Sequence, residues 1–344
     1  MSVRGHLSAL VWPISIGLLV LSFVLSVSVG ASGFTPLDLF HSFRAARAAP
    51  DGHLALARTV LLSIRLPRTL TAGLTGGALA AAGVASQGLF RNALASPSVL
   101  GTEAGGSFGA VLLFYFGAAY WHWLSLPLAA FVGALGATAF IFVLAARGPT
   151  RTIEFLLLAG FAVNALAGAL SSLVVSLSLE DYQKTGAIMH WLLGGFAGKG
   201  WEHVWMAAPP MVAGFALVIW LAPRLDVLAL GEDVAASLSV DMRFLRRASI
   251  VAIAVLVGTA VAVAGAIPFV GLVVPHFTRL IAGPQHRRLV WLSTINGMSL
   301  VMLADLVART IRAPAEIEVG ILTSLIGAPF FLVLLLSQKK GQIG

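Results

Sequence analysis

Long apolar segments follow one another along almost the whole chain, separated by short polar connections. A helix needs about 20 mostly apolar residues to cross the hydrocarbon core of a bilayer. Because the apolar residues are continuous and do not alternate with polar ones, helices are expected and barrel strands are not. The pattern predicts ten spans, near residues 10–32, 69–88, 98–118, 124–145, 153–178, 204–222, 249–267, 268–283, 289–308 and 319–337.

The predicted fold is an all-α polytopic membrane protein with a single transmembrane domain over residues 1–344. The first segment is expected to be a retained span, because its apolar stretch over 7–29 exceeds the roughly 7–15 residues of a signal peptide's apolar region. The eighth span is short and begins beside Pro268, which indicates a broken helix. The similarity of residues 78–83 to 260–265 is compatible with an inverted repeat of five helices in each half.

The composition agrees with a chain surrounded by lipid. Of its residues, 58% are hydrophobic and 10% are charged, whereas soluble proteins have about 25% charged residues, so a soluble enzyme is excluded. The 22 Lys and Arg residues outnumber the 14 Asp and Glu residues, but they are scattered between apolar segments. That scatter argues against a nucleic-acid partner and for a lipid bilayer. The absence of cysteine excludes disulfides, cysteine-ligated metals and thiol catalysis.

The basic residues also predict an orientation. Ten spans place both termini on one side of the membrane, and if that side is cytoplasmic, the inner connections hold 13 of the 22 basic residues. This weak positive-inside bias predicts a multi-pass protein of the cell (inner) membrane with both termini in the cytoplasm. The outer connections then hold the other nine basic residues: Arg44, Arg47, Arg58, Arg65, Arg68, Lys184, Lys199, Arg309 and Arg312.

Two short motifs suggest chemistry that their surroundings do not support. Gly105 to Gly109 matches the G-x-S-x-G pattern of serine hydrolases, but that turn follows a strand, and here both flanks are membrane helix. An intramembrane serine protease that uses Ser107 and His276 remains an alternative. The segment Gly194–Gly200 is one residue too short for a phosphate-binding loop and has no Ser or Thr after its lysine.

Ionisable residues give little sign of a metal site or a proton relay. The eight histidines show no metal-ligand spacing, so we expect this chain to bind no metal and no cofactor of its own. Acidic residues are nearly absent from the centres of the spans, where Glu103, Glu154 and Asp305 come closest. A proton-driven carrier usually needs a committed acidic residue at that depth. An ion-coupled secondary transporter is therefore a weaker alternative.

Three polar stretches stand out against the apolar background. The first begins at Arg65-Leu-Pro-Arg68 and ends after the second span, at Gln87–Pro97. The third lies nearer the C-terminus and comprises Gly265–Arg279, Ala304–Arg309 and Gly320–Phe330. The second is the inner loop Leu228–Val240, whose apolar residues Val234, Leu238 and Met242 have helical spacing. A short amphipathic helix there is suited to a groove on a cytoplasmic partner, and an interfacial helix lying on lipid is the alternative.

From about Arg65 to Leu336, the order and spacing of these stretches resemble the permease family of ATP-binding-cassette importers for cobalamin, ferric siderophores and haem. The resemblance implies the type II importer fold and a homodimer of ten-span subunits. It also implies a periplasmic substrate-binding protein outside and two copies of a separate ATPase inside, with ATP and Mg²⁺ bound by that ATPase. The sequence departs from the family's usual pattern at Ala93, Ser239, Pro268 and Glu318.

The resemblance also assigns roles to particular residues. It implies a cytoplasmic coupling loop over 228–247 that contacts the ATPase, and a cytoplasmic gate at Asn92 and Leu94. Arginines that pair with glutamates of the binding protein are implied at Arg65, Arg68 and Arg309, with Arg312 as a weaker candidate. The coupling residues implied are Leu230, Gly231, Glu232, Asp233, Ala235, Leu238, Ser239 and Val240.

The predicted function is transport without chemistry by this chain. We expect a permease that moves a bulky metal chelate into the cytoplasm, with hydrolysis of ATP by the partner subunit. Haem is the favoured cargo because residues 308–316 most resemble those of haem-import members. Ferric siderophore or cobalamin is the alternative within the same importer type.

Overall fold

Helices account for almost all of the computed structural model, which describes residues 3–30, 52–147 and 153–338, and no strand occurs in that part of the chain. The long elements in chain order are α1 (Val3–Ser28), α4 (Leu66–Leu89), α5 (Thr102–Tyr115), α6 (Ser125–Arg147), α7 (Ile153–Leu177), α9 (Trp201–Leu228), α11 (Met242–Ala264), α12 (Val270–Ala282), α13 (His286–Thr310) and α14 (Val319–Gln338). The short elements are α3 (Gly52–Thr59), a π-helical turn (Val60–Arg65), 3-10 turns (Pro97–Leu100 and Ala118–Tyr120), α8 (Tyr182–Leu193) and α10 (Glu232–Ser237).

In the described residues, each of the ten expected spans overlaps one of the long helices, and which of them cross the membrane stays a prediction. Within the described residues, seven helical stretches are long and apolar enough to cross a membrane. Val270–Ala282 and Val319–Leu334 are shorter apolar stretches, and α5 has 14 residues. The predicted all-α membrane fold is confirmed.

The helix that forms the second span begins earlier than expected. From Gly52 to Leu89 the chain forms 38 continuous helical residues, whereas the sequence pattern predicted a span over 69–88. A proline such as Pro67 normally occurs in the first turn of a helix, because it lacks an N–H group. The structure instead places a π-helical turn directly before Leu66 and Pro67. Such a turn changes the hydrogen-bond spacing, which lets a helix continue past a proline.

The helix α8 was not predicted from the sequence. It begins at the cap residue Asp181, whose carboxylate accepts a hydrogen bond from the Lys184 N–H at 3.1 Å, and it ends at Gly194, which has a φ of 69°. Its 12 residues are too few to cross a bilayer, so the pattern of long apolar segments does not predict it. The helix-start residue Asp181 and the stop residue Gly194 were the available signals.

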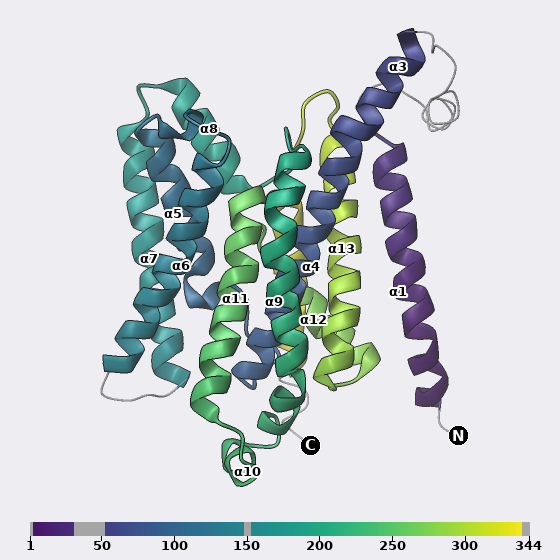
Figure 1. Ribbon diagram of the computed structural model, residues 1–344, viewed down its shortest axis with the longest axis vertical. Coiled ribbons are helices and arrows are strands. Elements are labelled where there is room, and N and C mark those ends of the chain that lie inside the picture. Colours follow the sequence, from purple (N-terminus) through teal and green to yellow (C-terminus); the bar gives the residue numbers. More distant parts are fainter. Residues whose placement is uncertain (1–2, 31–51, 148–152, 339–344) are drawn as a thin grey trace.

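The helices form two groups that α11 joins (Figure 1). One group contains α5, α6, α7 and α8, and the other contains α4, α9, α12 and α13, with α1 outermost against α13. The helix α11 packs against α5 and α6 on one side and against α4 and α9 on the other. The chain is thus one continuous bundle.

The helix α4 is the most enclosed element, and glycines allow its neighbours to approach it closely. A side chain at Gly83 would place its Cβ 1.9 Å from the carbonyl oxygen of Gly271 on α12. A Cβ at Gly76 would lie 2.2 Å from the carbonyl oxygen of Gly297 on α13. Neither distance is compatible with a side chain, so glycine at these positions lets the backbones of α4, α12 and α13 pack in direct contact.

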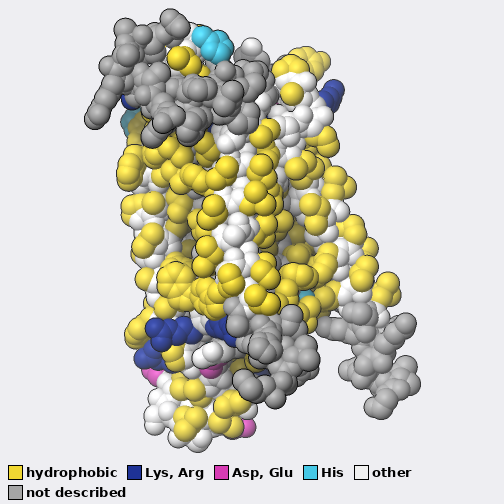
Figure 2. Space-filling view, turned by 90° about the vertical axis from the view of Figure 1, so that its right-hand side faces the viewer, with side chains coloured by type: hydrophobic (Ala, Val, Ile, Leu, Met, Phe, Trp, Pro, Cys, Tyr) yellow, Lys and Arg dark blue, Asp and Glu magenta, His cyan; other side chains and the backbone are white. Residues whose placement is uncertain are grey.

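The two ends of the bundle differ. The first turn of α1, the C-terminal end of the described chain and α10 lie at one end, and α3 and α8 lie at the other (Figure 1). Hydrophobic side chains cover the middle of the molecule, and Lys and Arg side chains gather near the α10 end (Figure 2). The helices α4 and α11, which carry the similar segments 78–83 and 260–265, run in opposite directions (Figure 1). An inverted repeat requires that relationship, and the repeat itself stays a prediction.

Candidate functional site

An arginine cluster joins α4, α13 and the end of α1. Its members are Arg65, Arg68, Arg309, Asp305 and Glu316. The guanidinium group of Arg68 donates to Asp305 from Nε at 3.0 Å and from Nη2 at 2.7 Å. It also donates to Glu316, from Nη1 at 2.9 Å and from Nη2 at 2.8 Å. Arg68 is therefore held between two carboxylates in a geometry that uses its planar shape.

The other two arginines of the cluster bind the C-terminal end of α1. Arg65 donates to the carbonyl oxygens of Val27 at 3.2 Å and Ser28 at 2.7 Å. Arg309 donates to the backbone carbonyl of Ser26 and, at 2.9 Å, to its hydroxyl group. The last carbonyls of a helix have no partner within the helix and carry the negative end of its dipole. Cations are therefore stabilised at this end of α1.

The three arginines of the cluster are buried, although the sequence placed them on connections at the outer side of the membrane. Arg65, Arg68 and Arg309 are buried, and Asp305 is completely buried. Arg312, on the connection after α13, is exposed. Three of the four predicted docking arginines are thus held inside the protein by the buried carboxylate of Asp305, the partly exposed carboxylate of Glu316 and the carbonyls at the end of α1. Their docking role stays a prediction. Arg44 and Arg47 lie outside the described residues.

The predicted coupling loop projects at the opposite end. The helix α10 is six residues long, and Leu230 and Leu238, which flank it, are 69% and 60% exposed. Glu232 accepts hydrogen bonds from Nη2 of Arg246 at 2.7 and 2.8 Å, which ties the start of α10 to α11. Ala235 is buried against the bundle. The loop therefore has a fixed inner side and an apolar outer side.

Two backbone conformations shape this loop. Gly231 has a φ of 123° before α10, and Ser239 has a φ of 61° after it. A left-handed conformation costs a residue with a side chain about 1–2 kcal/mol, which explains why glycine would suit the position of Ser239. The turn at Ser239 ends the helix. Val234, Leu238 and Met242 therefore do not form one helical stripe, as their spacing predicted, because Met242 already belongs to α11.

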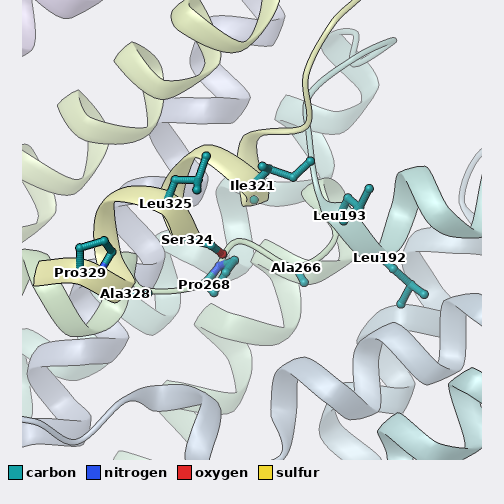
Figure 3. A pocket seen from close by; sticks show the side chains of 10 residues that line it. Leu192, Leu193, Ala266, Pro268, Ile321, Ser324, Leu325, Ala328 and Pro329 are labelled. Atoms are coloured by element: carbon teal, nitrogen blue, oxygen red, sulfur yellow. The ribbon is translucent and has the colours of Figure 1, made fainter. Parts of the chain in front are cut away.

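An apolar cavity lies between α8, α14 and the segment that joins α11 to α12. Its volume is about 500 Å³, within the usual range for small-molecule sites. Hydrogen bonds join its walls, from Gly195 N–H to the Ala264 carbonyl at 2.8 Å and from Gly320 N–H to the Gly194 carbonyl at 3.2 Å. The cavity is lined by Gly320 and by the residues labelled in Figure 3, which are Leu192, Leu193, Ala266, Pro268, Ile321, Ser324, Leu325, Ala328 and Pro329.

A histidine and a glutamate connect the same two helices. Nδ1 of His190 on α8 hydrogen-bonds to Oε1 of Glu318, the residue directly before α14. His190 is one helical turn from Leu193 and Glu318 is two residues from Gly320, so each member of the pair is close in sequence to a residue that lines the cavity. Sequence reasoning singled out Glu318 only as a departure from the family pattern, and it gave His190 no role.

Comparison with known proteins identifies the family. The FecCD transport family matches residues 18–337. The chain belongs to the FecCD transport family. It is 38% identical to the hemin transport system permease protein HmuU of Yersinia pestis. The similarity extends over 292 residues, which are 83% of this chain and 85% of that protein. The chain is 35% identical over 327 residues to the vitamin B12 import system permease protein BtuC of Escherichia coli, with 94% of each covered.

A solved structure agrees with this membership. It is described as an inward-facing conformation of a metal-chelate type ABC transporter. The two proteins are 33% identical in sequence, and their structures superimpose with a TM-score of 0.82 over 94% of this chain and 99% of that chain. The predicted resemblance is confirmed, and this FecCD-family chain is a transport permease subunit of an ABC importer for metal chelates. Family membership implies an ATPase and a binding protein as partners. It does not select the cargo, since the relatives are named for hemin and vitamin B12.

In this FecCD-family permease, the two predicted gate residues lie in the turn that follows α4. Arg91 has a φ of 48°, and the side-chain oxygen of Asn92 accepts a hydrogen bond from the Leu94 N–H at 2.9 Å. Asn92 is exposed and Leu94 is half-buried. Backbone hydrogen bonds from Asn92 N–H to the Gln87 carbonyl at 3.1 Å and from Ala95 N–H to the Asn92 carbonyl at 3.0 Å also hold this turn. The gating role stays a prediction.

The geometry gives no support to an enzyme site. Ser107 lies on α5 and His276 on α12, and no hydrogen bond joins them in the structure. Nδ1 of His276 is buried without a hydrogen-bond partner. Nucleophilic catalysis by serine requires a base within hydrogen-bond reach of the hydroxyl group. Among the described residues there is also no group of three or more His, Asp or Glu side chains that could hold a metal ion.

Proposed function

We propose that this permease carries haem into the cytoplasm, as a homodimer powered by two copies of a separate ATPase that bind ATP and Mg²⁺. The observation that carries the ATP-driven importer mechanism is the α10 loop, which presents exposed apolar side chains at Leu230 and Leu238 and is tied to α11 by the Glu232–Arg246 pair. A short, rigid apolar projection beyond the membrane belt is suited to a groove on a soluble partner. An interfacial helix on lipid would need a longer apolar face than six residues provide.

The proposed orientation follows from this role. If α10 meets the ATPase, then the end with α10 and the described ends of α1 and α14 is cytoplasmic, and the end with α3 and α8 faces the periplasm. The binding protein would dock there, with exposed Arg312 as the first contact. Arg65, Arg68 and Arg309 could join this contact only if Asp305, Glu316 and the end of α1 released them.

Haem is the proposed cargo because residues 308–316 resemble those of haem-import members, and a relative at 38% identity is a hemin permease. The apolar walls of the cavity are suited to a flat apolar macrocycle. Ferric siderophore or cobalamin is the second candidate, and the relative named for vitamin B12 favours cobalamin.

Transport in proteoliposomes tests the proposal. The permease is reconstituted with its ATPase and binding protein, and uptake of haem, cobalamin and a ferric siderophore is measured with ATP or with a non-hydrolysable analogue. We expect uptake of haem only with ATP. Uptake driven by an ion gradient without ATP would overturn the importer mechanism, and ATP-driven uptake of another chelate alone would overturn the choice of haem.

A further inference from the structure

The His190–Glu318 pair joins the two helices that form most of a largely apolar cavity, in which Ser324 is the polar lining side chain. The cavity walls come from the last turn of α8 and the first three turns of α14, and the pair joins the same two helices. The two residues lie 128 positions apart in the sequence, so only the fold brings them together. A few well-placed polar groups in an apolar site normally orient the ligand and select it.

The hydrogen bond determines which ring nitrogen of His190 is available. The Nδ1–H group donates to the carboxylate of Glu318, so the lone pair of the neutral ring lies on Nε2. No described residue hydrogen-bonds to Nε2, and the His190 side chain is 75% exposed. Histidines that bind metals almost always donate their other N–H group to a carboxylate, a backbone carbonyl or a water molecule. His190 therefore has the arrangement of a metal ligand.

Glu318 is held in place as the orienting partner. Its side chain is only 16% exposed, and its backbone carbonyl accepts the Ile321 N–H at 3.1 Å at the start of α14. The other carboxylate oxygen lies over Gly195, where an added Cβ would approach Oε2 to 2.5 Å. The glutamate is thus fixed from both sides, while the histidine projects from the surface of α8.

We propose that His190 is an axial ligand for the metal of the transported chelate, and that Glu318 positions its imidazole ring. The proposal rests on the function proposed above. The lone pair of Nε2 would replace a water or another exchangeable ligand on the metal, without a change in oxidation state. The substrate class is a metal chelate with a flat apolar face and one exchangeable coordination position. A chelate whose metal is already saturated would gain nothing from this residue.

A single histidine is sufficient for such a substrate. A free metal ion needs three or more protein ligands, and the described residues contain no group of that kind. A chelated metal already has its equatorial donors, so one imidazole completes its coordination. The apolar walls then contact the macrocycle, and the histidine distinguishes the metal-loaded ring from the empty one.

The test uses the full-length permease in lipid nanodiscs, with iron(III) protoporphyrin and metal-free protoporphyrin as probes. We expect iron protoporphyrin to show the absorption shift of imidazole coordination with the unchanged protein. His190→Ala should abolish this shift and leave binding of the metal-free ring unchanged. His122→Ala, which removes another exposed histidine, should behave as the unchanged protein does. Glu318→Gln and Gly195→Ala should each weaken binding of iron protoporphyrin by about tenfold or more, because they disturb the orienting carboxylate.

The outcomes separate this inference from the proposed function. An unchanged shift in His190→Ala, or no coordination by the unchanged protein, would overturn the axial-ligand role. Equal binding of both rings by every variant would also overturn it, because the histidine would then not distinguish the metal-loaded ring from the empty one. If ATP-driven uptake of haem persists in those cases, only the inference fails. If haem uptake is also absent, the proposed cargo fails as well.

Discussion

The Arg68 guanidinium group on α4 binds both carboxylate oxygens of Asp305 on α13, with Nε 3.0 and 3.1 Å from the two oxygens. Asp305 is completely buried and Arg68 nearly so. Arg309 lies 3.7 Å from the same carboxylate, one helical turn further along α13. Asp305 thus balances two buried cations, and Glu316 completes the hydrogen bonding of Arg68.

Removing the shared carboxylate should destabilise the protein strongly. Asp305→Ala leaves Arg68 and Arg309 buried with fewer partners, and breaking a buried pair in this way typically costs about 3–5 kcal/mol. Thermal unfolding of the detergent-solubilised permease should therefore show a clearly lower midpoint for this variant. Arg312→Ala, which removes an exposed cation near the same end, should change stability by less than about 0.5 kcal/mol. Equal midpoints for the two variants would contradict a structural role of the cluster.

Gly83→Ala should prevent α4 and α12 from packing as they do. The new Cβ would meet the backbone oxygen of Gly271 at 1.9 Å, and a backbone atom cannot move aside as a flexible side chain can. Overpacking typically costs about 1–3 kcal/mol, and a clash with backbone should lie at or above the upper end. Gly136→Ala on α6 is the matched control, because an added Cβ there meets nothing within 4 Å. Yield and melting temperature in detergent measure both, and a fully stable Gly83→Ala protein would contradict the close approach.

The order of the membrane helices follows from the sequence because burial in lipid requires one long apolar segment for each span. The same reasoning cannot find α8, since a helix of 12 residues that stays within the protein needs no such segment. It also missed the helical residues from Gly52 to Arg65, which precede the span predicted over 69–88. A π-helical turn before Pro67 lets the helix continue, and sequence spacing does not predict it.

The functional residues were predicted less completely, because single residues carry no record of their partners. The i,i+4 spacing of Asp305 and Arg309 was a sign that this arginine is paired within the protein. Glu316 and the carbonyls at the end of α1 could not be assigned to the cluster without the fold. His190 and Glu318 are 128 positions apart, so no local pattern could have joined them.

Lys199 should lose its proton near physiological pH. It lies half-buried in the connection between α8 and α9, with its ammonium group 5.2 Å from the ring centroid of Trp191. Desolvation lowers the pKa of Lys199 to about 8, and the nearby carboxylate of Glu202 opposes part of this shift. The unfolded chain, with a pKa near 10.5, then binds more protons than the folded one above pH 8. The contribution of Lys199 to folding stability should therefore rise as the pH increases from about 8 to 10.5.

Acylation of Lys199, followed by mass spectrometry across a pH series, measures this shift. Modification by an amine-reactive reagent should reach half its maximal rate near pH 8. Glu202→Gln removes a carboxylate that raises the pKa of Lys199, so its midpoint should move to lower pH. A midpoint near pH 10.5 in both proteins would mean that the Lys199 ammonium group is fully solvated.

Leu238→Asp should weaken binding of the ATPase without unfolding the permease. Leu238 is 60% exposed beside α10, so a charged side chain costs the fold little but disfavours an apolar groove on the partner. We expect an affinity at least about tenfold weaker, which corresponds to about 1.4 kcal/mol, together with loss of transport-coupled ATP hydrolysis.

Leu179→Asp is the matched control, because Leu179 is 58% exposed and precedes α8 at the opposite end of the bundle (Figure 1). Binding of the purified ATPase to nanodisc-embedded permease distinguishes the two. If both variants bind the ATPase normally, the α10 loop does not contact it. If the affinity of both variants for the ATPase falls equally, the effect comes from the added negative charge and not from its position on the α10 loop.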